Sequence, residues 1–265
     1  MTEEEMLRVV RNRSKEAGIP SEYDVEVMGK KIPVPVRYTN ASAFLLLFSI
    51  SYKQAQKMLK SNIVTPVRWF GDRSLLEVTL FKYQDEPVDL YYESTFSIPV
   101  IHKKTLQLPV VPVLLESFFK SYGHYVFLMG VDSPFSRKHI EEIFPYPLYQ
   151  KDLDIFLERN NSLITGHIKD KSENIFSFKA KKTTGHTLAH KRFMTYYKVD
   201  DTIHNVHLNT FSFSKYIFQT HDIEICLGNH EISMMLTALE INKKPIVGID
   251  FLKAVEIASG PKQIQ

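Results

Sequence analysis

The sequence contains little cysteine and little tryptophan, with one residue of each among 265. A single cysteine, Cys226, excludes an intrachain disulfide framework and a zinc site built from cysteines. Cys226 lies in an apolar, strand-like run, which predicts an unreactive thiol in the core. Glycine is also scarce and scattered, and the sequence has no Gly-rich loop of the kind that binds phosphate.

Long apolar runs and blocks of one charge are absent as well. No stretch of about 18 apolar residues occurs, and the acidic residues 1–6 lack the basic and apolar regions of a signal peptide. The 33 Lys and Arg and the 30 Asp and Glu are interspersed and give a formal net charge of +3. We therefore expect a cytoplasmic protein that binds neither nucleic acid nor membranes.

What the sequence does contain is a series of short apolar segments. Thr2 and Glu5 match a capping box, so residues 1–28 are predicted to form an N-terminal helical extension, and residues 29–265 a single domain. Further helices are predicted after Ser51, after Ser133 and from Asn229 or His230. The spacing of the strands is typical of an antiparallel sheet or barrel, and they are expected at residues 44–50, 75–83, 91–101, 124–131, 152–158, 163–168, 175–180, 193–199, 211–218, 222–227 and 245–258.

Glu93 is the strongest functional candidate. It is the one acid in a strand of otherwise apolar and hydroxyl-bearing residues, where a carboxylate is rarely buried without a use. Glu77 lies on the preceding predicted strand, so antiparallel pairing is expected to bring both carboxylates to one pocket. Two acids in an aromatic pocket raise each other's pKa, and one then stays protonated and acts as a general acid. The alternative for Glu77 is a solvent-facing position on an edge strand.

Two segments resemble the acetoacetate decarboxylase family. Glu93-Ser94 followed by Ile98-Pro99-Val100 is similar to that family's pocket strand, and Glu77 falls on a second family glutamate. The run from Asp132 through Glu142, Tyr146 and Pro147 is similar to a family helix and the Tyr-Pro that follows it. The resemblance covers about residues 30–260. It implies a β-dominated α+β fold, namely a cone-shaped antiparallel β-barrel with peripheral helices, and a homo-oligomer.

One position departs from the family. The Schiff-base lysine and its neighbouring lysine fall on Leu148 and Tyr149, and a leucine cannot form an imine. The family's pocket arginine falls at Phe48 or Ser49. Lys151 lies three residues beyond Leu148, roughly 10 Å along an extended chain, and is either a substitute nucleophile or a solvated lysine.

The residues and the resemblance together predict one site. Its catalytic carboxylates are Glu93 and Glu77, and its substrate-binding residues are Tyr92, Tyr146, Leu148, Tyr149, Ser49 and His102. No cofactor or metal is expected, because no helix or carboxylate motif supports the histidine pairs at 186 and 190 or at 204 and 207. The implied function is lyase-type acid/base chemistry on a small oxo-acid or related metabolite, without an imine. The alternatives are a non-catalytic binder that has lost decarboxylase activity, and a scaffold whose pocket is filled by Phe48, Leu148 and Tyr149.

Overall fold

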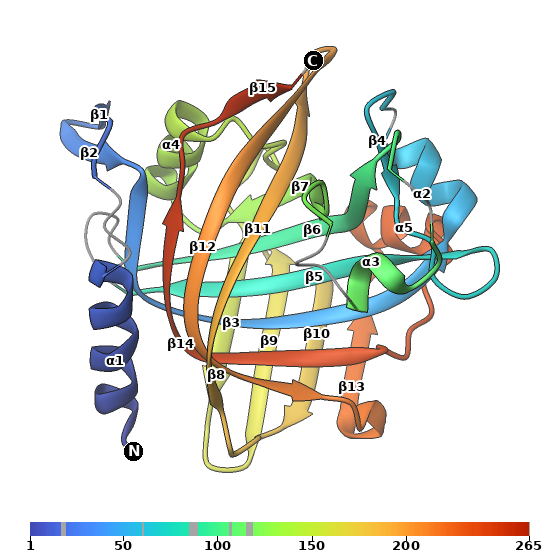
Figure 1. The fold of residues 1–265 in the computed structure, drawn as a ribbon. Helices are drawn as coiled ribbons and strands as arrows, with labels where there is room; N and C mark the ends of the chain where they lie inside the picture. Colours follow the sequence, from blue (N-terminus) through green and yellow to red (C-terminus); the bar gives the residue numbers. More distant parts are fainter. Residues whose placement is uncertain (17–19, 60, 85–89, 106–107, 115–118, 265) are drawn as a thin grey trace.

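The computed structural model describes residues 1–16, 20–59, 61–84, 90–105, 108–114 and 119–264. Its main feature is a barrel in which each strand is hydrogen-bonded to the next, in the order β11-β7-β6-β5-β3-β14-β12 and back to β11 (Figure 1). The strands are β3 (Val36–Ser51), β5 (Arg73–Tyr83), β6 (Tyr91–His102), β7 (Gly123–Val131), β11 (Thr187–Val199), β12 (Thr202–Ile217) and β14 (Val247–Ala258).

The barrel is closed by a short parallel pairing. Met194, Thr195 and Tyr196 of β11 lie beside Gly123, His124 and Tyr125 of β7, whereas the other barrel pairs are antiparallel. A Cβ atom at Gly123 would overlap the carbonyl oxygen of Met194, so glycine allows the two backbones to approach. The predicted β-dominated barrel with peripheral helices is therefore confirmed, with one parallel junction among its antiparallel pairs.

A second, antiparallel sheet packs against the outside of the barrel. Its strand order is β13-β10-β9-β8, with β8 (Asp154–Arg159), β9 (Leu163–Asp170), β10 (Glu173–Lys181) and β13 (Ile223–Leu227). Apolar side chains that point outward from β3, β5 and β6 meet this sheet, and the Phe44 and Phe178 rings stack with centroids 4.6 Å apart. Because one face of these barrel strands is covered in this way, the opposite face is left to line the interior.

Helices and short strands surround the barrel. Helix α1 runs along its outside and places Val10 against Phe211 and Val255 (Figure 1). The helices are α1 (Glu3–Glu16), α2 (Tyr52–Leu59), α3 (Val111–Leu114), α4 (Pro134–Ile143), α5 (Glu231–Ala238) and the 3-10 turn η2 (Thr220–Asp222). The remaining strands are β1 (Tyr23–Val27), β2 (Lys30–Val34), β4 (Val64–Pro66) and β15 (Lys262–Ile264). Among the described residues, no helix is long and apolar enough to cross a membrane.

Most predicted elements are present at the expected places. Thr2 and Glu5 exchange hydrogen bonds, as a capping box requires, and Ser133 caps α4. The hairpin of β1 and β2 was not predicted; its turn at Met28 and Gly29 falls on the proposed boundary between residues 1–28 and 29–265, and that division stays a prediction. The expectation of a core Cys226 is wrong, because β13 is an edge strand and this thiol is exposed.

Candidate functional site

The interior of the barrel holds a cavity of about 130 Å³. This is roughly ten times the space that one water molecule requires, so a small organic molecule fits. All seven barrel strands contribute to its lining, because alternate residues of each strand point inward. Phe48, which the scaffold alternative places in the pocket, instead points outward and packs edge-on against Phe176.

Glu93 lies towards one end of the cavity. Its side chain is buried, and its carboxylate accepts a hydrogen bond from the Tyr91 hydroxyl at 3.3 Å. Burial, followed by the nearby charge of Glu256, raises the pKa of Glu93 to about 8. Glu256 projects into the same cavity from β14, and burial raises its pKa to about 7. Near neutral pH this end of the cavity therefore holds carboxyl groups that carry protons.

Tyrosines surround these two acids. The rings of Tyr38 and Tyr91 both pack against Tyr83, with centroids 4.5 and 4.7 Å from that of Tyr83. Desolvation raises the pKa of all three well above the usual tyrosine range, so their hydroxyls stay protonated and donate hydrogen bonds. Tyr38 hydrogen-bonds to His139 of α4 at 2.8 Å. The Tyr83 hydroxyl has no partner within the described part of the chain.

Glu77 lies towards the other end of the cavity. It is hydrogen-bonded to Nδ1 of His124 and accepts a hydrogen bond of 2.9 Å from the Ser97 hydroxyl. In the pairing of β5 with β6, Glu77 is opposite Ser97, whereas Glu93 is opposite Phe81. The two glutamates face the same cavity but are four positions apart, roughly 13 Å along the strands. The prediction that Glu77 raises the pKa of Glu93 is wrong, because Glu256 does so.

Of the predicted substrate-binding residues, only Tyr146 lines the cavity, where its hydroxyl is hydrogen-bonded to Thr195. Tyr92 follows Tyr91 on β6 and so points to the outer face of the barrel. Leu148 is bridged to Met129, and it is Met129 that lines the cavity.

Three other predicted residues also lie outside the cavity. Ser49 accepts a hydrogen bond from Arg73, Tyr149 donates one to Asp170, and His102 accepts one from the Lys104 amide. The prediction that these residues, Tyr92 and Leu148 share the pocket of Glu93 is therefore wrong.

Sequence reasoning missed Glu256, Thr210 and His124. Glu256 is an isolated acid in an apolar strand, which is the same signal that identified Glu93 and that would have found it. Thr210 is its direct partner on β12 and also lines the cavity. No local signal marks Thr210 or His124, because their positions follow from the pairing of distant strands.

The cavity is acidic. Among the described residues that line it, three are glutamates and none is lysine or arginine. Lys151 is 61% exposed and forms an ion pair with Asp170 at 2.8 Å, so it is solvated and is not a replacement for the missing lysine. No cluster of potential metal ligands occurs in the described ranges.

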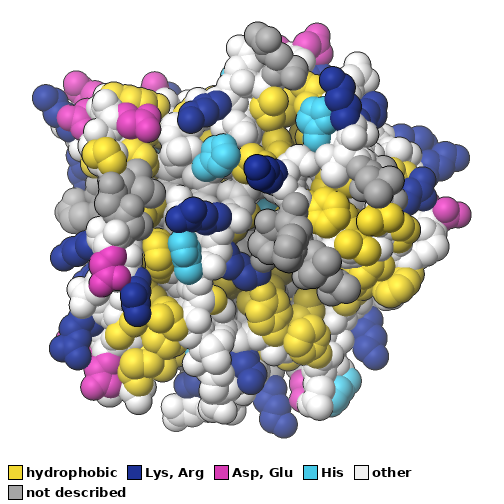
Figure 2. Space-filling view, viewed as in Figure 1, with side chains coloured by type: hydrophobic (Ala, Val, Ile, Leu, Met, Phe, Trp, Pro, Cys, Tyr) yellow, Lys and Arg dark blue, Asp and Glu magenta, His cyan; other side chains and the backbone are white. Residues whose placement is uncertain are grey.

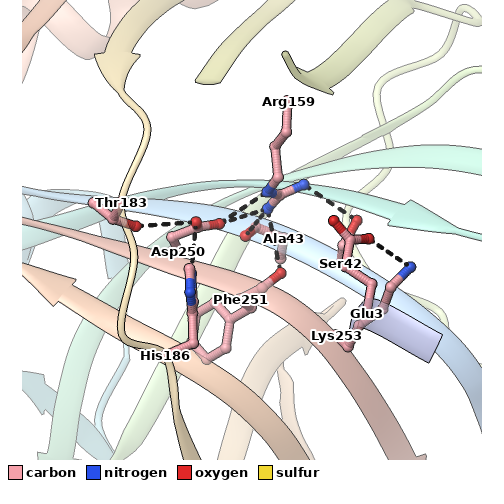
Figure 3. Close-up of polar contacts among 9 residues, drawn as sticks. All are labelled: Glu3, Ser42, Ala43, Arg159, Thr183, His186, Asp250, Phe251 and Lys253. Atoms are coloured by element: carbon pink, nitrogen blue, oxygen red, sulfur yellow. Dashed lines mark hydrogen bonds and ion pairs between the residues drawn. The ribbon is translucent and has the colours of Figure 1, made fainter. Parts of the chain in front are cut away.

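A buried ion-pair cluster supports the wall of the cavity (Figure 3). Arg159 reaches from β8 to Asp250 of β14 at 2.8 Å, and it also donates to the carbonyl oxygens of Ala43 and Phe251 at 2.9 and 3.2 Å. The pairing of β14 with β3 is interrupted immediately after Phe251, so the guanidinium supplies donors where the backbone ladder ends. His186 completes the cluster by bonding the other carboxylate oxygen of Asp250 at 2.9 Å.

Compared by sequence, the chain matches no protein-family model and no curated protein. Compared by structure, it resembles an acetoacetate decarboxylase with a TM-score of 0.57 and 12% identity, covering 86% of this chain and 88% of the other. The acetoacetate decarboxylase of Legionella pneumophila gives 0.57 and 15%, with 86% of each chain covered. The enduracididine biosynthesis enzyme MppR, complexed with the condensation product of pyruvate and imidazole 4-carboxaldehyde, gives 0.55 and 8%, covering 84% and 87%. The chain therefore has the acetoacetate decarboxylase fold, as the short motifs predicted.

Proposed function

We propose that the protein catalyses lyase-type or enol-forming proton transfer on a small carbonyl metabolite bound in the barrel cavity, with Glu93 as the acid/base group and without an imine. The observation that carries the proposal is a buried carboxyl group, with its pKa raised to about 8, facing an open cavity. A carboxyl group tuned in this way exchanges protons with carbon acids near physiological pH. An oxo-acid substrate, as the family resemblance implies, is one member of this class.

The surrounding residues suggest how the step proceeds. The ionised form of Glu93 removes a proton from the carbon next to the substrate carbonyl. The electron pair of that C–H bond forms a C=C bond, and the π electrons of the carbonyl move onto its oxygen to give an enolate. Tyr83 lies on β5 two residues beyond Phe81, the residue opposite Glu93. The Tyr83 hydroxyl donates a hydrogen bond to the developing enolate oxygen. Glu77 is too far along the strands to share this step. Glu77 is hydrogen-bonded to Nδ1 of His124 and to Ser97, so we assign to it the role of holding the His124 ring in position.

A hydrogen–deuterium exchange assay tests the proposal. Small carbonyl compounds, including acetoacetate, pyruvate, acetone and aminoacetone, are incubated with the protein in D₂O, and loss of the proton signal next to the carbonyl is followed by NMR. We expect Glu93→Gln to lower the exchange rate of the active compound by roughly a hundredfold or more, because the amide cannot accept the proton. The rate for the unmodified protein is expected to rise with pH and to level off above about 8, where Glu93 is ionised.

Glu224→Gln is the matched control, because Glu224 is exposed on β13, outside the barrel. It is expected to exchange at the rate of the unmodified protein. If Glu93→Gln has an unchanged circular dichroism spectrum and still exchanges the substrate protons at the rate of the unmodified protein, the proposal is contradicted.

A non-catalytic binding protein is the second candidate. The observation that favours it is the lack of lysine and arginine among the described cavity residues, since this removes the nucleophile used by the decarboxylases. A compound that raises the unfolding temperature while its protons do not exchange supports this candidate. In either case we expect a cytoplasmic homo-oligomer that binds neither nucleic acid nor membranes, as the composition and the resemblance imply.

A further inference from the structure

Glu256 and Thr210 form a polar pair that the proposed chemistry does not use. They are direct partners in the register of β14 and β12, and both side chains line the cavity. Thr210 is only 7% exposed, and its hydroxyl has no hydrogen-bond partner within the described ranges. The Glu256 carboxyl group likewise has no hydrogen bond or ion pair there.

This arrangement is unfavourable for the empty protein. The buried Thr210 hydroxyl loses its hydrogen bonds to water on folding, and no described protein group replaces them. The half-buried carboxyl group of Glu256 keeps contact with the cavity but has no partner among the described residues. Buried polar groups are normally satisfied, so an unsatisfied hydroxyl beside a carboxyl group that faces a cavity indicates a ligand that supplies the missing partner.

The lining of the cavity identifies the charge of that ligand. Three glutamates face the cavity, and one of them, Glu77, is paired with His124, which also lines it. No lysine or arginine lies among the described lining residues. Tyr38, Tyr83 and Tyr146 line the cavity, and each lies close enough to Glu256 for its charge to raise their pKa values. Carboxylates and aromatic faces both attract cations, and neither attracts anions.

We propose that Glu256 and Thr210 bind a small organic cation that carries N–H donors, such as an ammonium or guanidinium group of the substrate. The ligand donates to the Glu256 carboxylate and to the Thr210 hydroxyl oxygen, and its charge compensates the carboxylate on binding. The binding of a cation here does not depend on the proposed function. Its assignment to a substrate rests on that proposed function.

Calorimetric titration with three probes tests the proposal. Methylguanidinium keeps its charge at any accessible pH, methylurea has nearly the same shape without charge, and acetoacetate is an anion. We expect methylguanidinium to bind at least tenfold more tightly than methylurea, and acetoacetate to bind more weakly than either. Glu256→Gln is expected to weaken methylguanidinium binding at least tenfold while leaving methylurea nearly unchanged.

Further variants locate the site and separate it from the chemistry. Thr210→Val preserves the shape of the side chain and is expected to weaken methylguanidinium binding about threefold, the value of one hydrogen bond. Glu224→Gln, on the outside of the molecule, is expected to bind like the unmodified protein. Because Glu93 is largely protonated at pH 7, Glu93→Gln is expected to keep methylguanidinium affinity at that pH within about threefold although it lowers proton exchange roughly a hundredfold. The two proposals therefore fail independently.

Three results overturn the proposal. They are tighter binding of acetoacetate than of methylguanidinium, no measurable binding of methylguanidinium, and equal affinity in the unmodified protein and in Glu256→Gln. Should Glu256→Gln fail to fold, as judged by circular dichroism, unchanged methylguanidinium affinity in Thr210→Val overturns the Thr210 contact on its own.

Discussion

At the scale of single residues, the barrel interior is notable for two carboxyl groups whose surroundings disfavour their ionised form. Glu93 and Glu256 both have raised pKa values because they are removed from water without a cationic partner. Such groups destabilise the folded protein once they ionise. They are therefore better explained by binding or catalysis than by stability.

The raised pKa of Glu93 predicts a pH-dependent stability. The folded protein retains the Glu93 proton up to a pH of about 8, whereas the unfolded chain releases it at a pH of roughly 4.3. Between these values the folded state binds more protons, so the free energy of unfolding falls as pH rises, by roughly 1.4 kcal/mol per pH unit from this group. Glu93→Gln removes this contribution and is expected to flatten the curve of stability against pH.

Urea denaturation from pH 5 to pH 8 measures the effect, with Glu224→Gln as the control that keeps the slope of the unmodified protein. Glu256 contributes a slope of the same sign, so the curve for Glu93→Gln is expected to be flatter but not flat. Parallel curves for Glu93→Gln and the unmodified protein would mean that Glu93 is ionised in the folded state.

At the scale of helices and strands, the sequence predicted where elements lie better than it predicted which elements meet. The short apolar segments and the turn residues between them located β5, β6 and β7 to within a few residues. The junction of β11 with β7 joins residues about seventy positions apart and has no local signature. For the same reason Glu93 was found but was paired with Glu77 on the adjacent strand, whereas its electrostatic neighbour Glu256 lies on the last long strand.

The cluster around Arg159 gives a prediction at this scale. Arg159 is 11% exposed and holds Asp250, which is 1% exposed, so replacing Arg159 with methionine leaves a buried charge without its main partner. We expect Arg159→Met to lower the free energy of unfolding by roughly 3 to 5 kcal/mol. The exposed pair of Arg13 and Glu16 is the control, and Arg13→Met is expected to cost roughly 0.5 kcal/mol or less.

The same cluster also sets an acid limit. Burial opposes ionisation of Asp250, but the hydrogen bond from His186 and the charge of Arg159 outweigh it, so the pKa of Asp250 lies below its usual value. Stability from this group is present above a pH of roughly 3.9 and is lost as the pH falls further. Arg159→Met is therefore expected to bring acid unfolding to a higher pH. An unchanged unfolding free energy in Arg159→Met would contradict the role assigned to the cluster.

At the scale of the whole molecule, lysine and arginine side chains are separated from the cavity. The chain has 33 Lys and Arg, but the described cavity lining contains none of them. Figure 2 shows Lys and Arg side chains spread over one face of the surface, with Asp and Glu mainly near its edges. The net charge of +3 thus conceals an acidic cavity inside a basic protein. Composition alone cannot reveal this separation, because it depends on which face of each strand points inward.

This separation predicts the outcome of imine trapping. With acetoacetate and borohydride, the unmodified protein is expected to form no adduct at the barrel site, because Leu148 replaces the family lysine and Lys151 is solvated. Leu148→Lys is expected to fail as well, since position 148 does not line the cavity. Met129→Lys differs, because Met129 is 3% exposed, lines the cavity and has an unbranched side chain of similar length. We expect this variant to be destabilised by a few kcal/mol but to trap an adduct.

Intact and peptide mass spectrometry, with circular dichroism as the check on folding, distinguishes these cases. Burial lowers the pKa of the introduced amine at position 129, whereas the neighbouring carboxylates raise it. Trapping at a pH of about 8 or above therefore provides enough neutral amine to attack the carbonyl carbon. An adduct at position 148 in Leu148→Lys, or at Lys151 in the unmodified protein, would mean that the segment after Tyr146 reaches the cavity in solution. That result would contradict both the placement of this segment outside the cavity and the proposal of chemistry without an imine.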